Sequence, residues 1–342
     1  MSGPTVPTRP LAISSAHAPA LDLPARFLVV GVLMLALLAV LGPWTTPLLL
    51  GGFYDPRLLA FVHLNTLGVV GAVLVGASYQ LVPVVLQTPL ALPRLGRLSF
   101  WCYLGGLPAF LVGLLVTWRP GLAVGGTLLV VAFALYISVI GTTLGRAPER
   151  SVVAAHVAAA LVGVATAVLM GLALVLAKGT GLLGPLGLRL LAAHATLMLG
   201  GWVTVMLTGV SYRLVGMFTL AEDALWHPGA WLELVLTTAG AWLLAVGLLF
   251  DVGGLRLAGG ALLLAGLALF FGLLVRMYRH RRRGGVDVHA PFALTAGLLA
   301  VGAAGLLVIG LARGASPSEP VWIAVGWLAL AGVAEMAIQG FF

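Results

Sequence analysis

Two histidines occupy matched places in two copies of one apolar motif. The first copy runs from His63 to Val84 and the second from His194 to Met217. Superposing the Ser-Tyr pairs near the ends of these copies also brings Gly68 onto Gly201. A histidine inside a membrane helix is costly to place there and needs a partner, so two in matched positions predict a dedicated binding site.

The chemistry that suits such a pair is metal ligation by neutral imidazole. Two imidazoles on facing helices can hold a heme iron from its two faces, which makes His63 and His194 candidate axial ligands of a b-type heme. Copper bound by the same side chains is the alternative metal. A third interpretation is structural, because a membrane histidine can simply hydrogen-bond to a neighbouring helix.

Small and polar residues beside the histidines could accommodate a porphyrin. Glycines would let a flat plate approach the backbone, although glycine in membrane helices also serves ordinary packing. Asn65, one turn from His63, could orient a ligand or cap a carbonyl group. The residues expected to pack against heme are Asn65, Gly68, Gly71, Thr196, Gly200 and Gly201.

The composition indicates which elements position these residues. Of the 342 residues, 61% are hydrophobic and 8% are charged, whereas a soluble domain has roughly 25% charged residues. Apolar stretches of membrane-spanning length recur along the chain and predict an all-α, polytopic transmembrane helix bundle. We expect ten spans, at residues 26–41, 58–86, 98–118, 121–144, 151–177, 188–218, 230–250, 255–277, 291–312 and 321–342. Residues 1–25 are expected to be a disordered tail and residues 26–342 a single transmembrane domain.

The basic residues predict the orientation of the bundle. The net charge of +8 lies mostly in loops, so it indicates topology and not nucleic-acid binding. Placing both termini in the cytoplasm leaves on the outer side only Arg57, Arg119, Lys178, Arg189, Arg256 and Arg313. The chain is therefore expected to be a multi-pass protein of the plasma (inner) membrane, in contact with lipid.

The repeated motif also predicts an internal repeat of four helices. An even number of spans separates the two copies, so both have the same orientation, and His63 and His194 should lie at similar depth near the outer face. The expected repeats are residues 26–144, 151–277 and, in part, 291–342. In the third, Gly326-Trp327 resembles Gly201-Trp202, and Glu319 would fall at the place of His194.

Other polar residues in the spans are weaker candidates. Tyr79 and Tyr212 are expected at the inner interface, as anchors or as members of a relay. Glu335 is a carboxyl group within a span, and so is either a functional group or a side chain that reaches the interface. His156 and His289 are expected near the inner surface, where they could form a second site. The single cysteine, Cys102, cannot form a disulfide framework.

The two motif copies resemble those of a known family. A histidine near the start, central glycines and the closing Ser78–Val82 and Ser211–Val215 segments resemble the heme-copper oxidase subunit I-like small membrane proteins, and more loosely the NnrS family. The resemblance implies an oxidase-like helical array that holds heme. Because adjacent histidines are missing and the last span has none, we do not expect a proton-pumping terminal oxidase.

The resulting hypothesis is a membrane hemoprotein for electron transfer or for the chemistry of O2 or NO. This would make it an oxidoreductase with a redox partner or another membrane subunit, and oligomers would be compatible with it. One alternative is a membrane transporter or chaperone for heme or copper. Another is a structural subunit of a respiratory complex, in which neither histidine holds a cofactor.

Overall fold

The computed structural model confirms the all-α membrane bundle. It describes residues 18–45, 55–178, 180, 182–283, 289–315 and 319–341, and side chains as far as residue 338. Within these residues there are ten helical spans long and apolar enough to cross a membrane, and no strand. Most of the expected tail lies outside the described residues, but α1 already begins at Asp22.

Seven spans are single helices, and three change winding halfway. The single ones are α1 (Asp22–Thr45), α4 (Pro93–Leu115), α5 (Arg119–Gly145), α6 (Val152–Ala177), α9 (His227–Leu249), α10 (Gly253–Arg279) and α11 (His289–Ala312). The composite ones are α2 (Pro56–His63), η3 (Leu64–Gly71) and α3 (Ala72–Val85); α7 (Leu186–Thr196), η4 (Leu197–Thr204) and α8 (Val205–Thr219); and α12 (Pro320–Trp327), η6 (Leu328–Glu335) and α13 (Met336–Phe341). A 3-10 turn, η5 (Glu222–Ala224), joins α8 to α9.

The three middle segments of the composite spans are π-helices of equal length. Each has 8 residues, begins with leucine and has glycine in fifth place, at Gly68, Gly201 and Gly332. Wider π winding is rare and is frequently found at functional sites. Aligning the π-helices puts Gly332 of the third copy at the place of Gly201, whereas the Gly-Trp pattern put Gly326 there. The third copy is therefore six residues later than the sequence pattern suggested. Val325, and not Glu319, therefore corresponds to His194.

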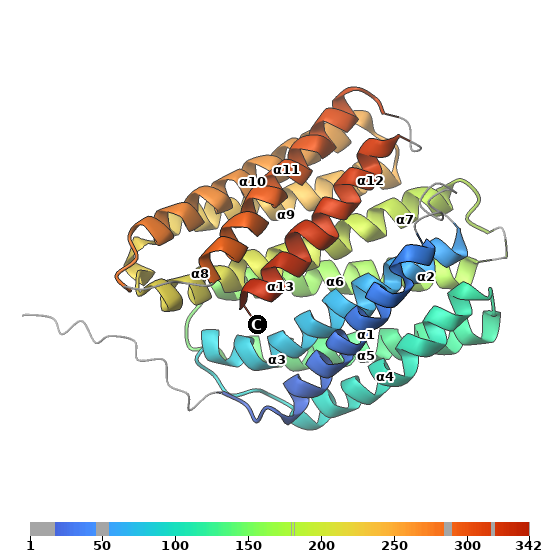
Figure 1. Ribbon diagram of the computed structural model, residues 1–342, viewed down its shortest axis with the longest axis horizontal. Coiled ribbons are helices and arrows are strands. Elements are labelled where there is room, and N and C mark those ends of the chain that lie inside the picture. The colour runs from blue at the N-terminus through green and yellow to red at the C-terminus, as the bar shows by residue number, and fades with distance from the viewer. Residues whose placement is uncertain are drawn as a thin grey trace, which may run out of the picture.

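Helix packing follows the same repeat. The helix α1 packs on η3 and α3, as α6 packs on η4 and α8 and α11 packs on η6 and α13. The hairpin of α4 and α5 in the first repeat corresponds to that of α9 and α10 in the second. In Figure 1 the α12–η6–α13 span crosses the front of the bundle between α11 and α1. The helices α3 and α8 are thus the inner helices of the first two repeats, whereas the α12–η6–α13 span lies largely at the surface.

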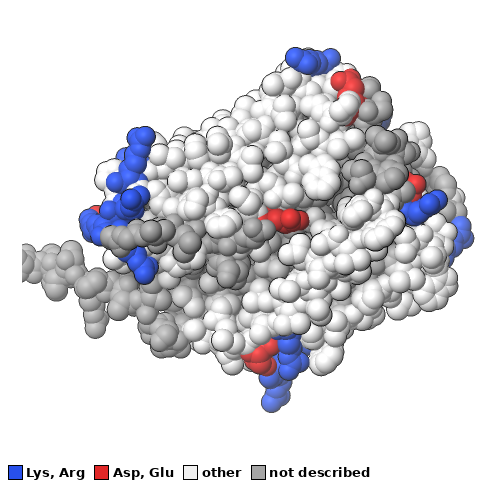
Figure 2. Space-filling model, in the orientation of Figure 1, with Lys and Arg blue, Asp and Glu red and all other residues white. Residues whose placement is uncertain are grey.

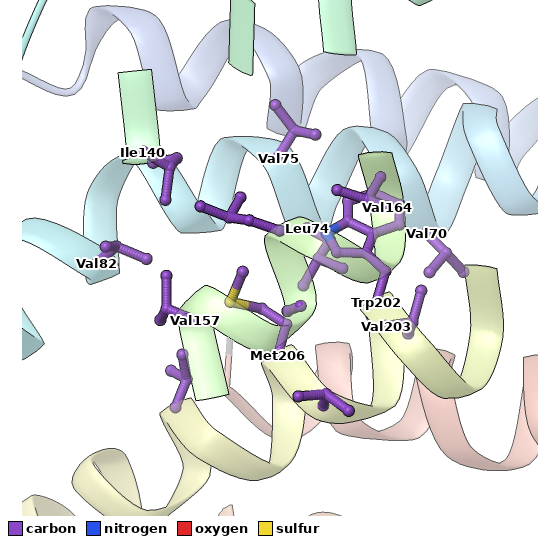
Figure 3. Close-up of a cluster of buried hydrophobic side chains, with 14 of the residues drawn as sticks. Val70, Leu74, Val75, Val82, Ile140, Val157, Val164, Trp202, Val203 and Met206 are labelled. Carbon is purple, nitrogen blue, oxygen red and sulfur yellow. The ribbon is translucent and has the colours of Figure 1, made fainter. Parts of the chain in front are cut away.

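The central core joins the first two repeats. Figure 3 shows Trp202 and Met206 of the second repeat packed toward Val70 and Leu74 of the first, with Val157 beside them. All five side chains are buried. Figure 2 shows that Lys and Arg side chains gather at helix ends, while the face between is largely uncharged. This arrangement suits a core and a lipid-facing surface that are both apolar.

A close backbone approach in the second repeat depends on Gly163. A Cβ atom at this position would overlap the carbonyl oxygen of Gly201, because α6 and η4 meet there backbone to backbone. We expect Gly163→Ala to lower the free energy of unfolding by about 1–3 kcal/mol, as overpacking does in other cores. The measurement is thermal unfolding in detergent, followed by circular dichroism.

The control for Gly163 is Gly272→Ala in α10. A Cβ atom at Gly272 would have no heavy atom within 4 Å, and alanine favours a helix over glycine. Gly272→Ala should therefore be neutral or slightly stabilising. Equal unfolding temperatures for the two variants would show that the α6–η4 contact tolerates a methyl group.

Candidate functional site

His63 lies at the junction between α2 and the first π-helix. Its Nδ1 is 2.7 Å from the carbonyl oxygen of Leu59, one turn earlier in the same helix. Since a carbonyl can only accept, Nδ1 carries the hydrogen and Nε2 keeps its lone pair. The ring packs edge-on against Phe110 of α4, with ring centroids 5.2 Å apart. The imidazole is thus held in one orientation with Nε2 available as a ligand.

His194 lies in the second repeat, in the last turn of α7, two residues before the repeat counterpart of His63. Its Nδ1 is 2.7 Å from the carbonyl oxygen of Ala167 on α6. A Cβ atom at Gly171 would lie 3.0 Å from Cε1 of this ring, so glycine makes room for the imidazole against α6. His194 is therefore oriented by a neighbouring helix and, like His63, has Nε2 free of any hydrogen bond within the described residues.

The two rings have the donor arrangement of metal ligands. A ligating histidine usually donates its second ring N–H to a carbonyl or carboxylate, which fixes the tautomer and the ring plane. Both rings are partly exposed. In repeat register they differ by two residues, or about 3 Å along the helix axis.

The two histidines form a small ligand set. Within the described residues, no group of three or more His, Cys, Asp or Glu side chains could hold a metal ion. Copper and zinc sites need several protein ligands, whereas heme iron needs only one or two because the porphyrin supplies four. Heme iron and copper both stay predictions for the two imidazoles.

The glycines expected to face a porphyrin face other helices instead. A Cβ atom at Gly68 would meet Met34 of α1, and one at Gly71 would meet the hydroxyl of Tyr103. Gly200 lies against Ala241 of α9, and Gly201 against Gly163 of α6. Their role is close helix packing. The two polar residues expected to pack against heme are Asn65 and Thr196. Thr196 donates its hydroxyl to the carbonyl of Ala192 in its own helix.

Asn65 joins the first repeat to the third through Glu335. Its amide nitrogen donates to the Glu335 carboxylate over 2.8 Å, which connects the start of η3 to the end of η6. Asn65 is buried, and its Oδ1 has no partner among the described residues. Figure 2 shows an acidic group in the middle of the uncharged face over α12 and α13. Glu335 thus makes an interhelical contact in the apolar zone.

Two substitutions of Glu335 distinguish the effect of its hydrogen bond to Asn65 from the effect of its charge. Glu335→Gln keeps an oxygen that accepts from Asn65, whereas Glu335→Leu leaves the buried amide without a partner. A buried polar group left unpaired costs about 1–3 kcal/mol. We therefore expect the leucine variant to unfold at a lower temperature than the glutamine variant. A leucine variant as stable as the glutamine variant would show that the bond contributes nothing.

Both tyrosines of the repeated Ser-Tyr pair are inside the bundle. Tyr79 is 0% and Tyr212 2% exposed, so the expectation of interface anchors is wrong. The physical reason is that α3 and α8 are the inner helices of their repeats, covered by α1 and α6. Tyr212 donates to Glu233 of α9 over 2.9 Å.

His156 and His289 have different partners. His156 is fully buried and lies 2.9 Å from the carboxylate of Glu233. His289 stacks on Phe218, with ring centroids 4.5 Å apart. The expected inner site therefore forms around Glu233 and not between the two histidines. Glu233 was not identified as a candidate from the sequence. A carboxyl group within a predicted span was the signal that identified Glu335, and Glu233 has the same signal in the predicted span 230–250.

Two apolar cavities flank α8 at the centre of the bundle. One lies among α3, α8 and α13, and the other lies among α8, α10, α11 and α13. Neither is lined by His63 or His194. The fit to heme therefore rests on the orientation of the two imidazoles. No protein-family model matches the sequence, and no curated protein matches it.

Proposed function

We propose that the protein is a membrane hemoprotein in which His63 and His194 are the axial ligands of b-type heme. The observation that carries the proposal is the shared geometry of the two rings. In both, Nδ1 is bound to a backbone carbonyl and Nε2 has no hydrogen-bond partner among the described residues, and the two positions differ by two residues in repeat register. A ligating histidine donates its second ring N–H in this way, which leaves the other nitrogen for the metal.

A heme at this place would supply one-electron redox chemistry or binding of a diatomic gas such as O2 or NO. The protein residues contribute orientation. Leu59 and Ala167 fix the ring planes through their carbonyl oxygens, and Phe110 and Gly171 limit how far the rings can turn. If both imidazoles bind one iron, no position is left for a gas, and electron transfer is the function that follows.

The wider setting belongs to the same proposal. The resemblance of the motif copies to the heme-copper oxidase subunit I-like proteins supports an oxidase-like array, and the repeated packing of the inner spans is compatible with it. The excess of arginine at the ends where α3, α5, α8 and α10 finish supports a cytoplasmic location for both termini in the inner membrane. We call this end of the bundle the arginine-rich end; its arginines include Arg94, Arg97, Arg146, Arg150, Arg213, Arg276, Arg279, Arg281, Arg282 and Arg283.

Retention of heme distinguishes a resident cofactor from a transported one. Purified protein from heme-replete cells is mixed with excess apomyoglobin, and the heme absorbance of each protein is measured after they are separated. A resident heme with two protein ligands should stay with the membrane protein for hours. Complete transfer to apomyoglobin would contradict the proposal and support a heme transporter or chaperone.

A further inference from the structure

A second polar cluster lies inside the second repeat, away from the candidate heme ligands. It consists of His156 on α6, Tyr212 on α8, and Glu233 and Thr237 on α9. His156, Glu233 and Thr237 are 0% exposed and Tyr212 is 2% exposed. Each of the three other side chains reaches the Glu233 carboxylate with an atom 2.9 Å away. The carboxyl group is therefore fully enclosed and accepts bonds from three directions.

The hydrogen bonds fix where the protons of this cluster reside. His156 Nδ1 lies 2.7 Å from the carbonyl oxygen of Val152, so Nδ1 carries a hydrogen. The hydroxyls of Tyr212 and Thr237 donate to the carboxyl oxygens. The line between His156 Nε2 and Glu233 Oε2 can hold one hydrogen or none. Without it the pair is imidazole and carboxylate with one negative charge, and with it the pair has taken up one proton. The pair is then imidazolium and carboxylate, or imidazole and carboxylic acid, and it is electrically neutral in both forms.

The first repeat shows what the fold requires at this place. Gly209 of α8 packs on His156, and its repeat counterpart Gly76 packs on Phe27. The ring pair His156–Tyr212 corresponds to Phe27–Tyr79, with centroids 5.7 Å apart in both.

The hairpins give the remaining counterparts. Gly240 packs on Gly259 as Gly106 packs on Gly125. In the same alignment of the two repeats, Ser99 of the first corresponds to Glu233 of the second. Ser99 is buried and donates to the carbonyl of Ala132. The first repeat thus has phenylalanine and serine at the places of His156 and Glu233, and the same helix packing forms without an ionisable pair. The pair is particular to the second repeat.

The cluster lies close to one end of the bundle. His156 is four residues from the start of α6, and Glu233 is six residues from the start of α9. At 1.5 Å per residue these positions are about 6 and 9 Å along the axis from the helix ends. His194, which contacts α6 at Ala167, is about 16 Å further along that helix.

We propose that His156 and Glu233 form a proton-binding site that exchanges a proton with the arginine-rich end of the bundle. The titratable groups at this site are His156 on α6, Tyr212 on α8 and Glu233 on α9. The fourth neighbouring helix, α10, faces it with Gly266 against Thr237 and Phe270 against Tyr212. The proposal does not depend on heme, because the pair is assembled from residues that contact neither His63 nor His194.

The test is an infrared difference spectrum of the purified protein between acidic and alkaline buffers, recorded in H2O and in D2O. The expected result is a protonated-carboxyl band, shifted by D2O, that is present in the wild type. It should be absent from Glu233→Gln and from the double variant His156→Phe/Glu233→Ser. The matched control is Glu222→Gln, which removes a partly exposed carboxyl group paired with Arg213 and should keep the band.

The double variant protects the test against a folding failure. It gives the second repeat the residues with which the first repeat is built, so it should give the same circular dichroism spectrum as the wild type. Identical difference spectra for the wild type and both Glu233 variants would overturn the proposal. The pair would then be a fixed ion pair that exchanges no proton.

Discussion

Replacing His156 with phenylalanine alone should destabilise the protein more than replacing both members of the buried pair. The single variant leaves the Glu233 carboxyl group enclosed with only two hydroxyl donors, Tyr212 and Thr237. Breaking a buried pair by removing one partner typically costs about 3–5 kcal/mol, because it leaves an uncompensated buried charge. The double variant leaves no such charge. His156→Phe/Glu233→Ser should therefore recover most of the stability lost in the single variant.

The measurement is a double-mutant cycle in detergent. The free energies of unfolding of the wild type, both single variants and the double variant are obtained by titration with SDS, followed by circular dichroism. We expect a coupling energy of several kcal/mol between the two positions, because they are in direct contact. Additive single effects would mean that His156 does not compensate the charge on Glu233.

Replacing either candidate ligand should remove heme from the purified protein. In His63→Ala and in His194→Ala one imidazole remains, and the iron loses one of its two protein bonds. We expect at least a tenfold loss of heme occupancy in each variant, in line with the effects of changes around metal ligands. The measurement is the ratio of heme absorbance to protein absorbance after purification under identical conditions.

His280→Ala is the matched control for these variants. His280 is an exposed histidine whose Nδ1 bonds to the carbonyl oxygen one turn earlier, as in His63. It stands at the end of α10 and has no role in the proposed site. Full heme occupancy in all three variants would show that neither His63 nor His194 is a ligand. If one variant keeps part of its heme and the other loses all of it, the histidine replaced in the second variant is the main ligand.

The sequence was sufficient for the spans but not for all their contacts. Membrane length and hydropathy are local properties, so the predicted span 255–277 lies within two residues of α10 at each end. The π-helices were not anticipated, since no residue pattern specifies i to i+5 bonding. Without them the third copy was placed six residues early, on a Gly-Trp pair that also occurs by chance in a glycine-rich membrane protein.

The candidate site was predicted to the level of single residues, and its surroundings were not. His63 and His194 were selected because membrane histidines are costly, and this reasoning needs no tertiary information. Glu233 was overlooked because it stands near the start of its predicted span, where a carboxylate can be solvated. Only the packing of α6 and α8 against α9 shows that it is enclosed by His156 and Tyr212.

The heme content of the wild-type protein is the most direct test of His63 and His194 as heme ligands. A pyridine hemochrome assay on protein purified from heme-replete cells measures the number of b-type hemes per chain. If His63 and His194 hold one iron between them, the assay gives one heme per chain. A value of zero would contradict the account, and the two histidines would then be structural residues or transient metal ligands.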